Sequence, residues 1–278
     1  MGLDSKEARA ARERARETYS ADLTAYPEFQ AINVLVQKPT TSSVTDAIQR
    51  ILDLTRAAAS AEPGLIGDHL YHTSLSVIEI AKRTAPEDQV RLVEFVVRLQ
   101  KNALVNSTGK PLTHDGYRVW TDVPCLGYIA ADEWNAVDVL DPQATTLATS
   151  QYENLIAFLA QLSAAAPADD DDGRIPETDF SFWSIRAFKD AFSPNTGGEA
   201  AMRVASRWMQ YAATKILANV KHERVFGKRG DDPGTVMTTE MWDTWRDGFL
   251  TAQDIDWDEA TGQGVSHALG CMDEAASA

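Results

Sequence analysis

The sequence predicts an all-α protein, an irregular multi-helix array of about nine or ten helices with no significant sheet. Apolar residues recur at helical spacing over long stretches of the 278 residues. No stretch shows the strict alternation of apolar and polar residues that is typical of a strand. No internal repeat occurs at a fixed period, so we do not expect a regular solenoid.

The N-terminal elements follow from local signals. Residues 1–22 are rich in alanine and charge, and we expect a loosely docked helix there. Ser43 and Asp46 have the spacing of a capping box, so a helix should begin after Ser43. A periodic stretch covers 63–83, and Pro86 should open the next helix because proline fits a first helical turn. Apolar residues fill most of that helix's circumference, which predicts a place at the centre of the core.

The middle of the chain changes character. Residues 103–125 are irregular and punctuated by glycine and proline, and a short helix is expected around 129–139. Ser150 and Glu153 have capping-box spacing and predict the start of the next helix.

The C-terminal part predicts helices near 178–192 and 199–222, the second of which is the longest. Two more helices follow, one with Trp242 and Trp245 on one face and a last one that includes Val265.

Composition bounds the domain organisation. Hydrophobic residues make up 44% and charged residues 24% of the chain, which is ordinary globular usage. A chain of this length buries a large core without staples. We therefore expect a single all-α domain over 1–278, with an acidic linker at 166–176 between two packed halves. Cys125 and Cys271 are too few for a disulfide framework and are expected to be buried free thiols.

Charge and hydropathy bound the partners. The formal net charge of -15 argues against nucleic acid, because phosphate binding needs a basic face. No apolar run approaches the length of about 20 residues that a membrane span requires. The N-terminus also lacks the apolar core of a secretory signal. We therefore expect a cytoplasmic protein with no nucleic-acid partner and no membrane span, and the sequence leaves the oligomeric state open.

Four segments carry a family resemblance. They are Val119–Pro124, Tyr152–Ala160, Ala205–Ala212, and Trp242–Trp245 with Phe249. Their order and spacing resemble a fungal family known only as domain of unknown function 3632, over roughly residues 70–275. The resemblance implies a helical fold and a fungal origin, and it supplies no established catalytic residues. The sequence departs from the family pattern in the 183–192 helix, where Phe192 or a neighbour replaces an acidic residue usual in the family.

The catalytic candidates lie in the irregular loop, since functional residues concentrate on such loops. His114 and Asp115 are predicted as a general base and its partner, or Asp122 as a lone acid or base. In the alternative interpretation, Asp122 caps the next turn and Trp120 fills the core.

Aromatic residues form the second candidate set, a substrate-binding wall around an apolar small molecule. Its members are Trp120, Trp208, Tyr211, Trp242 and Trp245. The alternative is that these rings only fill the core, where each buries a large area.

We expect no metal and no cofactor. His69, His72 and Glu79 share one side of a helix, but without HExxH spacing or cysteine ligands an ordinary polar face is the better interpretation. The run 169–172 fits neither a diphosphate–magnesium motif nor a calcium loop, whose first ligand position would be Ala168. Phosphate-binding glycine loops, nucleophile elbows and dinucleotide fingerprints do not occur.

Two functional hypotheses follow. The first is a cofactor-independent enzyme of the isomerase, dehydratase or cyclase type, acting on an apolar small molecule in fungal secondary metabolism. The second is a noncatalytic helical protein-interaction or scaffold protein. A cavity with a convergent polar group favours the first, and a solid core with an exposed apolar groove favours the second.

Overall fold

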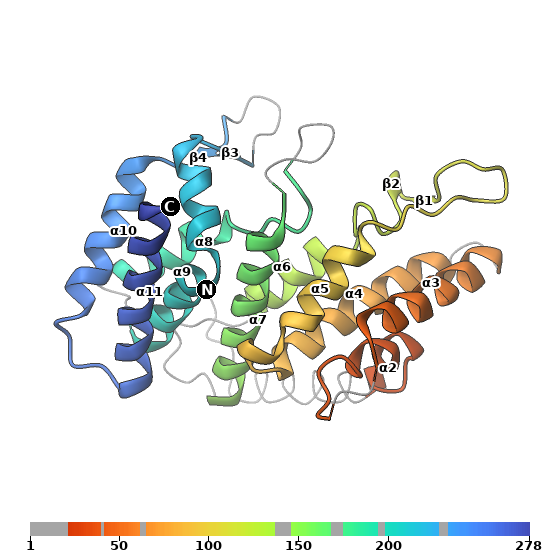
Figure 1. Ribbon diagram of the computed structural model, residues 1–278, viewed down its shortest axis with the longest axis horizontal. Coiled ribbons are helices and arrows are strands. Elements are labelled where there is room, and N and C mark those ends of the chain that lie inside the picture. Colours follow the sequence, from red (N-terminus) through yellow and green to blue (C-terminus); the bar gives the residue numbers. More distant parts are fainter. Residues whose placement is uncertain are drawn as a thin grey trace, which may run out of the picture. The chain divides into compact units, whose positions relative to one another are not determined.

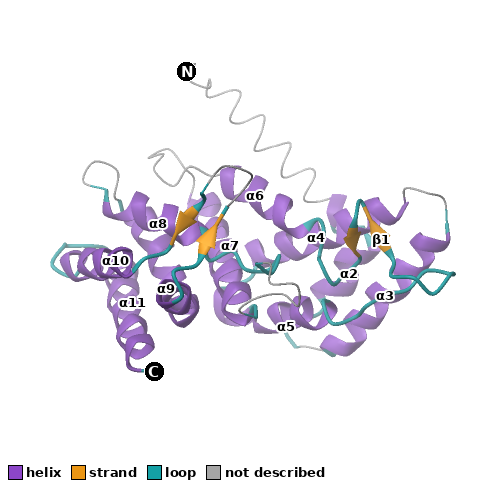
Figure 2. Cartoon of the chain, turned by 90° about the horizontal axis from the view of Figure 1, so that it is seen from above, coloured by secondary structure: helices purple, strands orange, loops and turns teal. Residues whose placement is uncertain are grey.

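The computed structural model describes residues 22–39, 42–61, 65–136, 146–167, 175–193, 198–227 and 233–278. These residues form ten α-helices, one 3₁₀ turn and two antiparallel pairs of two-residue strands (Figures 1 and 2). The predicted all-α class is confirmed. The short hairpins were not predicted, because two-residue strands leave no alternation to detect.

The chain forms two compact units, residues 1–130 and 131–278. The boundary falls inside helix α6, Leu126–Ala136, rather than at the predicted linker 166–176. Residues 168–174 of that linker lie outside the described residues, as does nearly all of the helix expected over 1–22. That the two units make one domain stays a prediction.

Four helices make up most of the first unit. Helix α2 contacts α3 and α4, and α3 contacts α4 and α5. Their bounds are α2 Pro27–Asn33, α3 Val44–Ser60, α4 Leu65–Arg83 and α5 Val90–Leu99, with the 3₁₀ turn η1 at Pro86–Asp88. The predicted capping box begins α3, where Ser43 Oγ accepts from the backbone N–H of Asp46 at 3.1 Å. A hairpin of β1 (Thr113–His114) and β2 (Tyr117–Arg118) follows α5.

Helix α5 corrects one expectation. Pro86 opens η1, and α5 itself begins at Val90. The helix buries one face, which includes Phe95 and Val96, whereas Val90 is 62% exposed. The prediction that this helix lies at the centre of the core was wrong. Apolar residues of its first turn face solvent, and the polar stripe leaves one side of the helix exposed.

The second unit is organised around α9, which contacts four other helices (Figure 1). Its elements are α7 Thr146–Ala165, α8 Trp183–Phe192, α9 Glu199–Lys221, β3 Val225–Phe226, β4 Thr235–Val236, α10 Thr239–Ala252 and α11 Glu259–Ser277. Helix α7 begins before Ser150, so the capping box predicted at Ser150 and Glu153 was wrong. Within the described residues, no helix is long and apolar enough to cross a membrane.

Candidate functional site

Asp122 closes the turn that leaves β2. Its carboxylate accepts from the backbone N–H of Arg118 at 2.6 Å and from the Arg118 guanidinium at 2.7 Å. The Asp122 backbone N–H donates in turn to the Arg118 carbonyl. These contacts favour the turn-capping interpretation of Asp122, because both carboxylate oxygens are already engaged.

His114 and Asp115 meet at the surface. The nearest nitrogen and oxygen of the pair lie 3.5 Å apart, and the Asp115 side chain is 85% exposed. Such an exposed ion pair contributes little to stability and does little to hold the imidazole in one orientation. The His114 ring instead packs on α4, where a Cβ added at Gly67 would come within 2.9 Å of Nε2. Asp115 and Gly116 both have positive φ, as a two-residue hairpin turn requires, which gives Asp115 a structural role.

Trp120 belongs to a buried polar network of four residues. Its Nε1–H donates to Thr55 Oγ1 at 3.0 Å, and His69 Nε2 lies 3.0 Å from the same oxygen. His69 Nδ1 lies 2.7 Å from a carboxylate oxygen of Glu28. We call Glu28, Thr55, His69 and Trp120 the buried polar network. It joins α2, α3, α4 and the loop before α6, so it holds four segments of the first unit together.

The electrostatics of the network centre on Glu28. Burial raises the pKa of this carboxyl group, but the hydrogen bond from His69 and the charges of His69 and His72 outweigh it. The net pKa of Glu28 therefore lies below its usual value. One Glu28 oxygen, Oε2, is buried without a hydrogen-bond partner.

A carboxylate, an imidazole and a hydroxyl in a row is the arrangement that activates a nucleophile in hydrolases. Here the Thr55 hydroxyl is fully buried, and it accepts from Trp120 while lying 2.7 Å from the Ile51 carbonyl. The row therefore binds segments of the fold to one another.

The expected polar face of α4 is divided among separate partners. His69 is buried in the network, the His72 ring lies tilted against Tyr26 with 4.1 Å between ring centroids, and Glu79 pairs with Lys82 and Arg83. Among the described residues, no group of three His, Cys, Asp or Glu side chains converges as a metal site would. Sequence spacing alone could not reveal that His69 faces inward.

A cavity of about 770 Å³ opens beside α2 in the first unit. It lies between α2, the segment that follows it, the C-terminal end of α4 and η1. We call it the α2–α4 groove. Its lining residues are Thr24, Phe29, Gln30, Asn33, Val34, Val36, Gln37, Lys38, Ile80, Arg83, Thr84, Ala85 and Asp88. The volume lies within the range of small-molecule sites.

Charged groups at the groove are held in place. The Arg83 guanidinium lies 2.7 Å from Glu79 and sits over the Phe29 ring, 5.8 Å from its centroid. Lys38 Nζ lies 2.7 Å from the Asp88 carboxylate. Apolar side chains and oriented polar groups therefore meet in one cavity, and no local sequence signal marks any of them.

Four of the five residues of the predicted aromatic wall belong to the second unit, and Trp120 belongs to the first. Trp208 is fully buried, and its ring centroid lies 6.3 Å from that of Trp134, which also contacts Tyr152 and Trp183. These contacts favour the core-packing interpretation of Trp208.

Helices α8 and α10 share a second aromatic group. Trp245 packs against Phe188 at 4.6 Å between centroids, and Trp242 is likewise buried. Tyr211 is half-buried on α9. The core-packing interpretation is favoured for Trp242 and Trp245, whose rings are buried.

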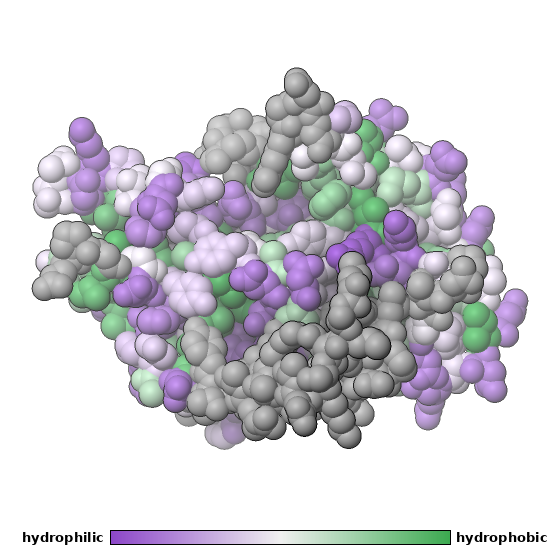
Figure 3. All heavy atoms as spheres, turned by 180° about the vertical axis from the view of Figure 1, so that it is seen from behind, coloured by the Kyte–Doolittle hydropathy of each residue, from purple (hydrophilic) through white to green (hydrophobic). Residues whose placement is uncertain are grey.

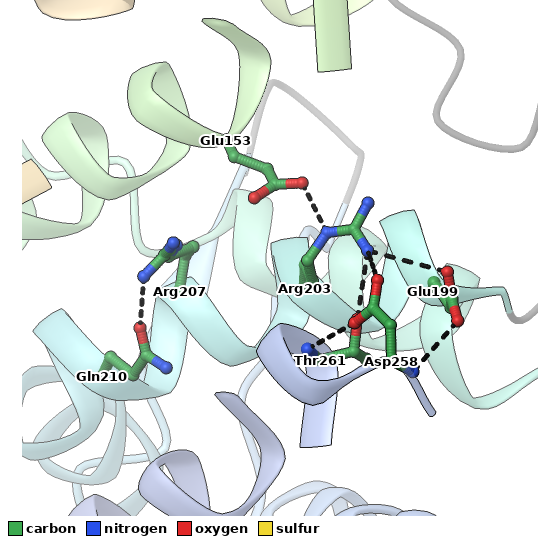
Figure 4. Close-up of polar contacts among 7 residues, drawn as sticks. All are labelled: Glu153, Glu199, Arg203, Arg207, Gln210, Asp258 and Thr261. Carbon is green, nitrogen blue, oxygen red and sulfur yellow. Dashed lines mark hydrogen bonds and ion pairs between the residues drawn. The ribbon is translucent and has the colours of Figure 1, made fainter. Parts of the chain in front are cut away.

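Arg203 clamps three helices of the second unit (Figure 4). The guanidinium of Arg203, on α9, lies 2.7 Å from Glu153 of α7. It also lies 3.3 Å from Asp258 and 3.0 Å from Thr261 Oγ1, at the start of α11, and 3.9 Å from Glu199. Hydrogen bonds from Thr261 lower the pKa of Asp258, which caps α11. The cluster fixes the start of α11 against α9 and α7.

The two cysteines are free. Cys125 is buried and Cys271 half-buried, and burial raises the pKa of both thiols. A raised pKa keeps a thiol protonated and unreactive at neutral pH.

The predicted site residues divide between the two units. His114, Asp115, Trp120 and Asp122 belong to the first unit, where His114 pairs with Asp115, Trp120 with Thr55 and Asp122 with Arg118. The other predicted residues, Trp208, Tyr211, Trp242 and Trp245, belong to the second unit.

Exposed apolar side chains are scattered. In the first unit they include Leu65, Tyr117 and Tyr128. On the face drawn in Figure 3, apolar residues appear as separate green spots among hydrophilic ones. This pattern does not single out one docking face on that side.

Comparison with known proteins gives a family. Residues 75–249, more than half of the chain, match the family described as protein of unknown function (DUF3632). This match confirms the resemblance carried by the tryptophan-rich segments. No curated protein and no solved structure matches the chain.

Proposed function

The chain belongs to the DUF3632 family, and we propose that its first unit binds a small organic molecule in the α2–α4 groove. The observation that carries this proposal is the cavity of about 770 Å³, in which apolar walls meet oriented polar groups. Small-molecule sites typically combine these two ingredients.

The apolar wall is supplied by two elements. Phe29 of α2 and Ile80 of α4 are buried and back the groove, while Val34 and Val36 line it from the segment after α2. Such a wall gains affinity by removing apolar ligand surface from water.

The polar groups are preorganised. Arg83 is fixed between Glu79 and the Phe29 ring, so it has little side-chain freedom left to lose on binding. Groups that are ordered before binding lower the entropic cost of association.

A large side chain placed in the groove tests the proposal. We expect the uncharged fluorescent dye N-phenyl-1-naphthylamine to bind the wild-type chain saturably and to lose that binding in Val34→Trp. Val90→Trp, on the exposed first turn of α5, is the matched control and should bind as the wild type does. Absence of saturable binding in the wild type, or equal binding in Val34→Trp, would overturn the proposal.

A second candidate keeps the enzyme hypothesis, as a cofactor-independent isomerase, dehydratase or cyclase. His69 does not serve as its base, because this side chain is buried and does not line the groove. The enzyme candidate therefore rests on the groove alone. Incubation of the wild-type chain with a molecule that binds there, followed by mass spectrometry of that molecule, tests it, and an unchanged molecule would contradict it.

The setting of this function is part of the proposal. We place it in the cytoplasm of a fungal cell, within small-molecule metabolism. The family resemblance supports the origin, and the acidic composition supports a freely soluble chain. Localisation of a fluorescently tagged chain in its own organism tests the cytoplasmic placement, and a membrane-bound or secreted pool would contradict it.

A further inference from the structure

The charged residues that line the α2–α4 groove are already paired. Lys38 Nζ lies 2.7 Å from the Asp88 carboxylate. Nε and Nη2 of Arg83 lie 2.8 and 2.7 Å from Glu79 Oε1. A charged ligand would have to compete with these partners, and it would lose more hydration on entering the groove than a neutral ligand does. The pairs therefore favour a ligand without net charge.

Carboxamide side chains follow one side of the groove. Gln30 and Asn33 line it from one face of α2, and Gln37 lines it from the segment that follows. Among the residues that the structure describes, none exchanges a hydrogen bond with the Asn33 side chain. Gln30 Nε2 lies 3.5 Å from the Thr24 carbonyl, the outer limit for such a bond. Asn33 and Gln30 therefore have hydrogen-bonding capacity to offer a ligand.

A carboxamide matches the peptide group in particular. It carries N–H donors beside a carbonyl acceptor, and a peptide group carries one of each. The two groups can therefore exchange two hydrogen bonds without any charge on either. The adjoining wall is apolar, with Phe29 and Ile80 buried behind it and Val34 at its edge, and it suits the side chain of an apolar amino acid.

From these observations we propose that the groove takes a small, uncharged, peptide-like amide. Its N–H and C=O groups pair with the carboxamides of Asn33 and Gln30, and its apolar side chain lies along Phe29, Val34 and Ile80. This inference rests on the proposed function and names its ligand class. No covalent step is involved.

The experiment compares four molecules that share the leucine side chain. N-acetyl-leucine N-methylamide is an uncharged diamide, and N-acetyl-leucine methyl ester replaces one of its N–H groups by oxygen. N-acetyl-leucine adds a negative charge, and leucine N-methylamide adds a positive one. Each competes at neutral pH with N-phenyl-1-naphthylamine bound to the full chain. We expect the diamide to bind about three- to tenfold more tightly than the ester, because one hydrogen bond contributes a factor of that order. The charged molecules should bind weakest.

Variants locate the peptide group. Asn33→Leu keeps a side chain of similar shape, and it should weaken binding of the diamide about three- to tenfold while leaving dye binding unchanged. Gln49→Leu is the control, since Gln49 is an exposed carboxamide bonded to Asp53 and does not line the groove. Val34→Trp should remove binding of both the diamide and the dye. Circular dichroism of each variant checks that the fold is retained, and Gln30→Leu makes the same test if Asn33→Leu does not fold.

The outcomes separate the two proposals. If the dye does not bind the wild-type chain, the proposed function itself fails. If the dye binds and none of the four molecules displaces it, the groove binds molecules but the peptide-like assignment is wrong. The assignment is also wrong if a charged molecule binds best or if the diamide and the ester bind equally. Diamide binding that is unchanged in both Asn33→Leu and Gln30→Leu would show that the carboxamides do not recognise it.

Discussion

Thr55→Val tests the buried polar network of the first unit. Valine keeps the shape of threonine and has a similar helix propensity, so the change removes little besides the hydroxyl. That hydroxyl is the shared partner of Trp120 Nε1 and His69 Nε2, each 3.0 Å away. Both nitrogens would then be buried without a partner, since Thr55, His69 and Trp120 are almost fully enclosed.

The magnitude follows from these two orphaned groups. An unsatisfied buried polar group costs about 1–3 kcal/mol, so Thr55→Val should lower the free energy of unfolding by about 2–6 kcal/mol. Thr73→Val is the matched control. Thr73 is an equally buried helical threonine, and its hydroxyl donates to the carbonyl of His69 at 2.8 Å. Its loss orphans no side chain, and we expect Thr73→Val to cost only about 0.5–1.5 kcal/mol, the net contribution of one ordinary hydrogen bond.

The assay is urea unfolding of the full chain, followed by far-UV circular dichroism, with midpoint and slope fitted for each variant. Equal losses of stability in Thr55→Val and Thr73→Val, or a loss below about 1 kcal/mol in Thr55→Val, would show that the network does not stabilise the unit. A double-mutant cycle with Trp120→Phe then measures the coupling of Trp120 and Thr55 directly.

Three further predictions concern pH, packing and charge. The pKa of Glu28 is lower in the folded chain than in the unfolded one. Its contribution to stability is therefore present above the unfolded pKa and is lost as pH falls through the folded pKa. When unfolding is followed at decreasing pH, Glu28→Gln should lose less stability than the wild type. Gly248→Ala should lower the free energy of unfolding by about 1 kcal/mol or more, because its Cβ would come within 2.7 Å of a phenylalanine ring. Gly262→Ala has open space around its Cβ and should stabilise α11 by about 0.5–1 kcal/mol in thermal melts. Arg203→Met should cost about 1–3 kcal/mol in urea unfolding by leaving Glu153 unpaired. Arg186→Met, at an exposed arginine, should cost almost nothing, and equal losses for the two arginines would contradict the clamp.

The helices could be predicted because their signals are local. The capping box of Ser43 and Asp46 lies within one turn, and the stripes of α9 and α10 repeat over a few residues. The hairpin at Asp115–Gly116 was also signalled locally, since an Asp-Gly pair suits a two-residue turn. We missed it because its strands are too short to alternate.

The polar clusters could not be predicted in the same way. Trp120 and Thr55 are 65 residues apart, and His69 and Glu28 are 41 apart. Arg203 and Glu153 are 50 apart. Each residue alone fits an ordinary polar face, and only the packing of helices brings the partners together. The α2–α4 groove is of the same kind, because its walls come from α2, α4 and the turn η1.

The strain in the loop before α6 and the buried polar network explain each other. Trp120 and Val123 have positive φ values of 66° and 37°. Bulky and β-branched residues rarely adopt this region, at a cost of about 1–3 kcal/mol each. We expect burial of the Trp120 ring and its hydrogen bond to Thr55 to offset that cost, so that the strained path of the loop depends on the network. In Thr55→Val, loss of stability should therefore be accompanied by faster amide hydrogen exchange at Trp120 and Val123, beyond that seen in Thr73→Val. Equal exchange in the two variants would show that the loop holds its path without the network.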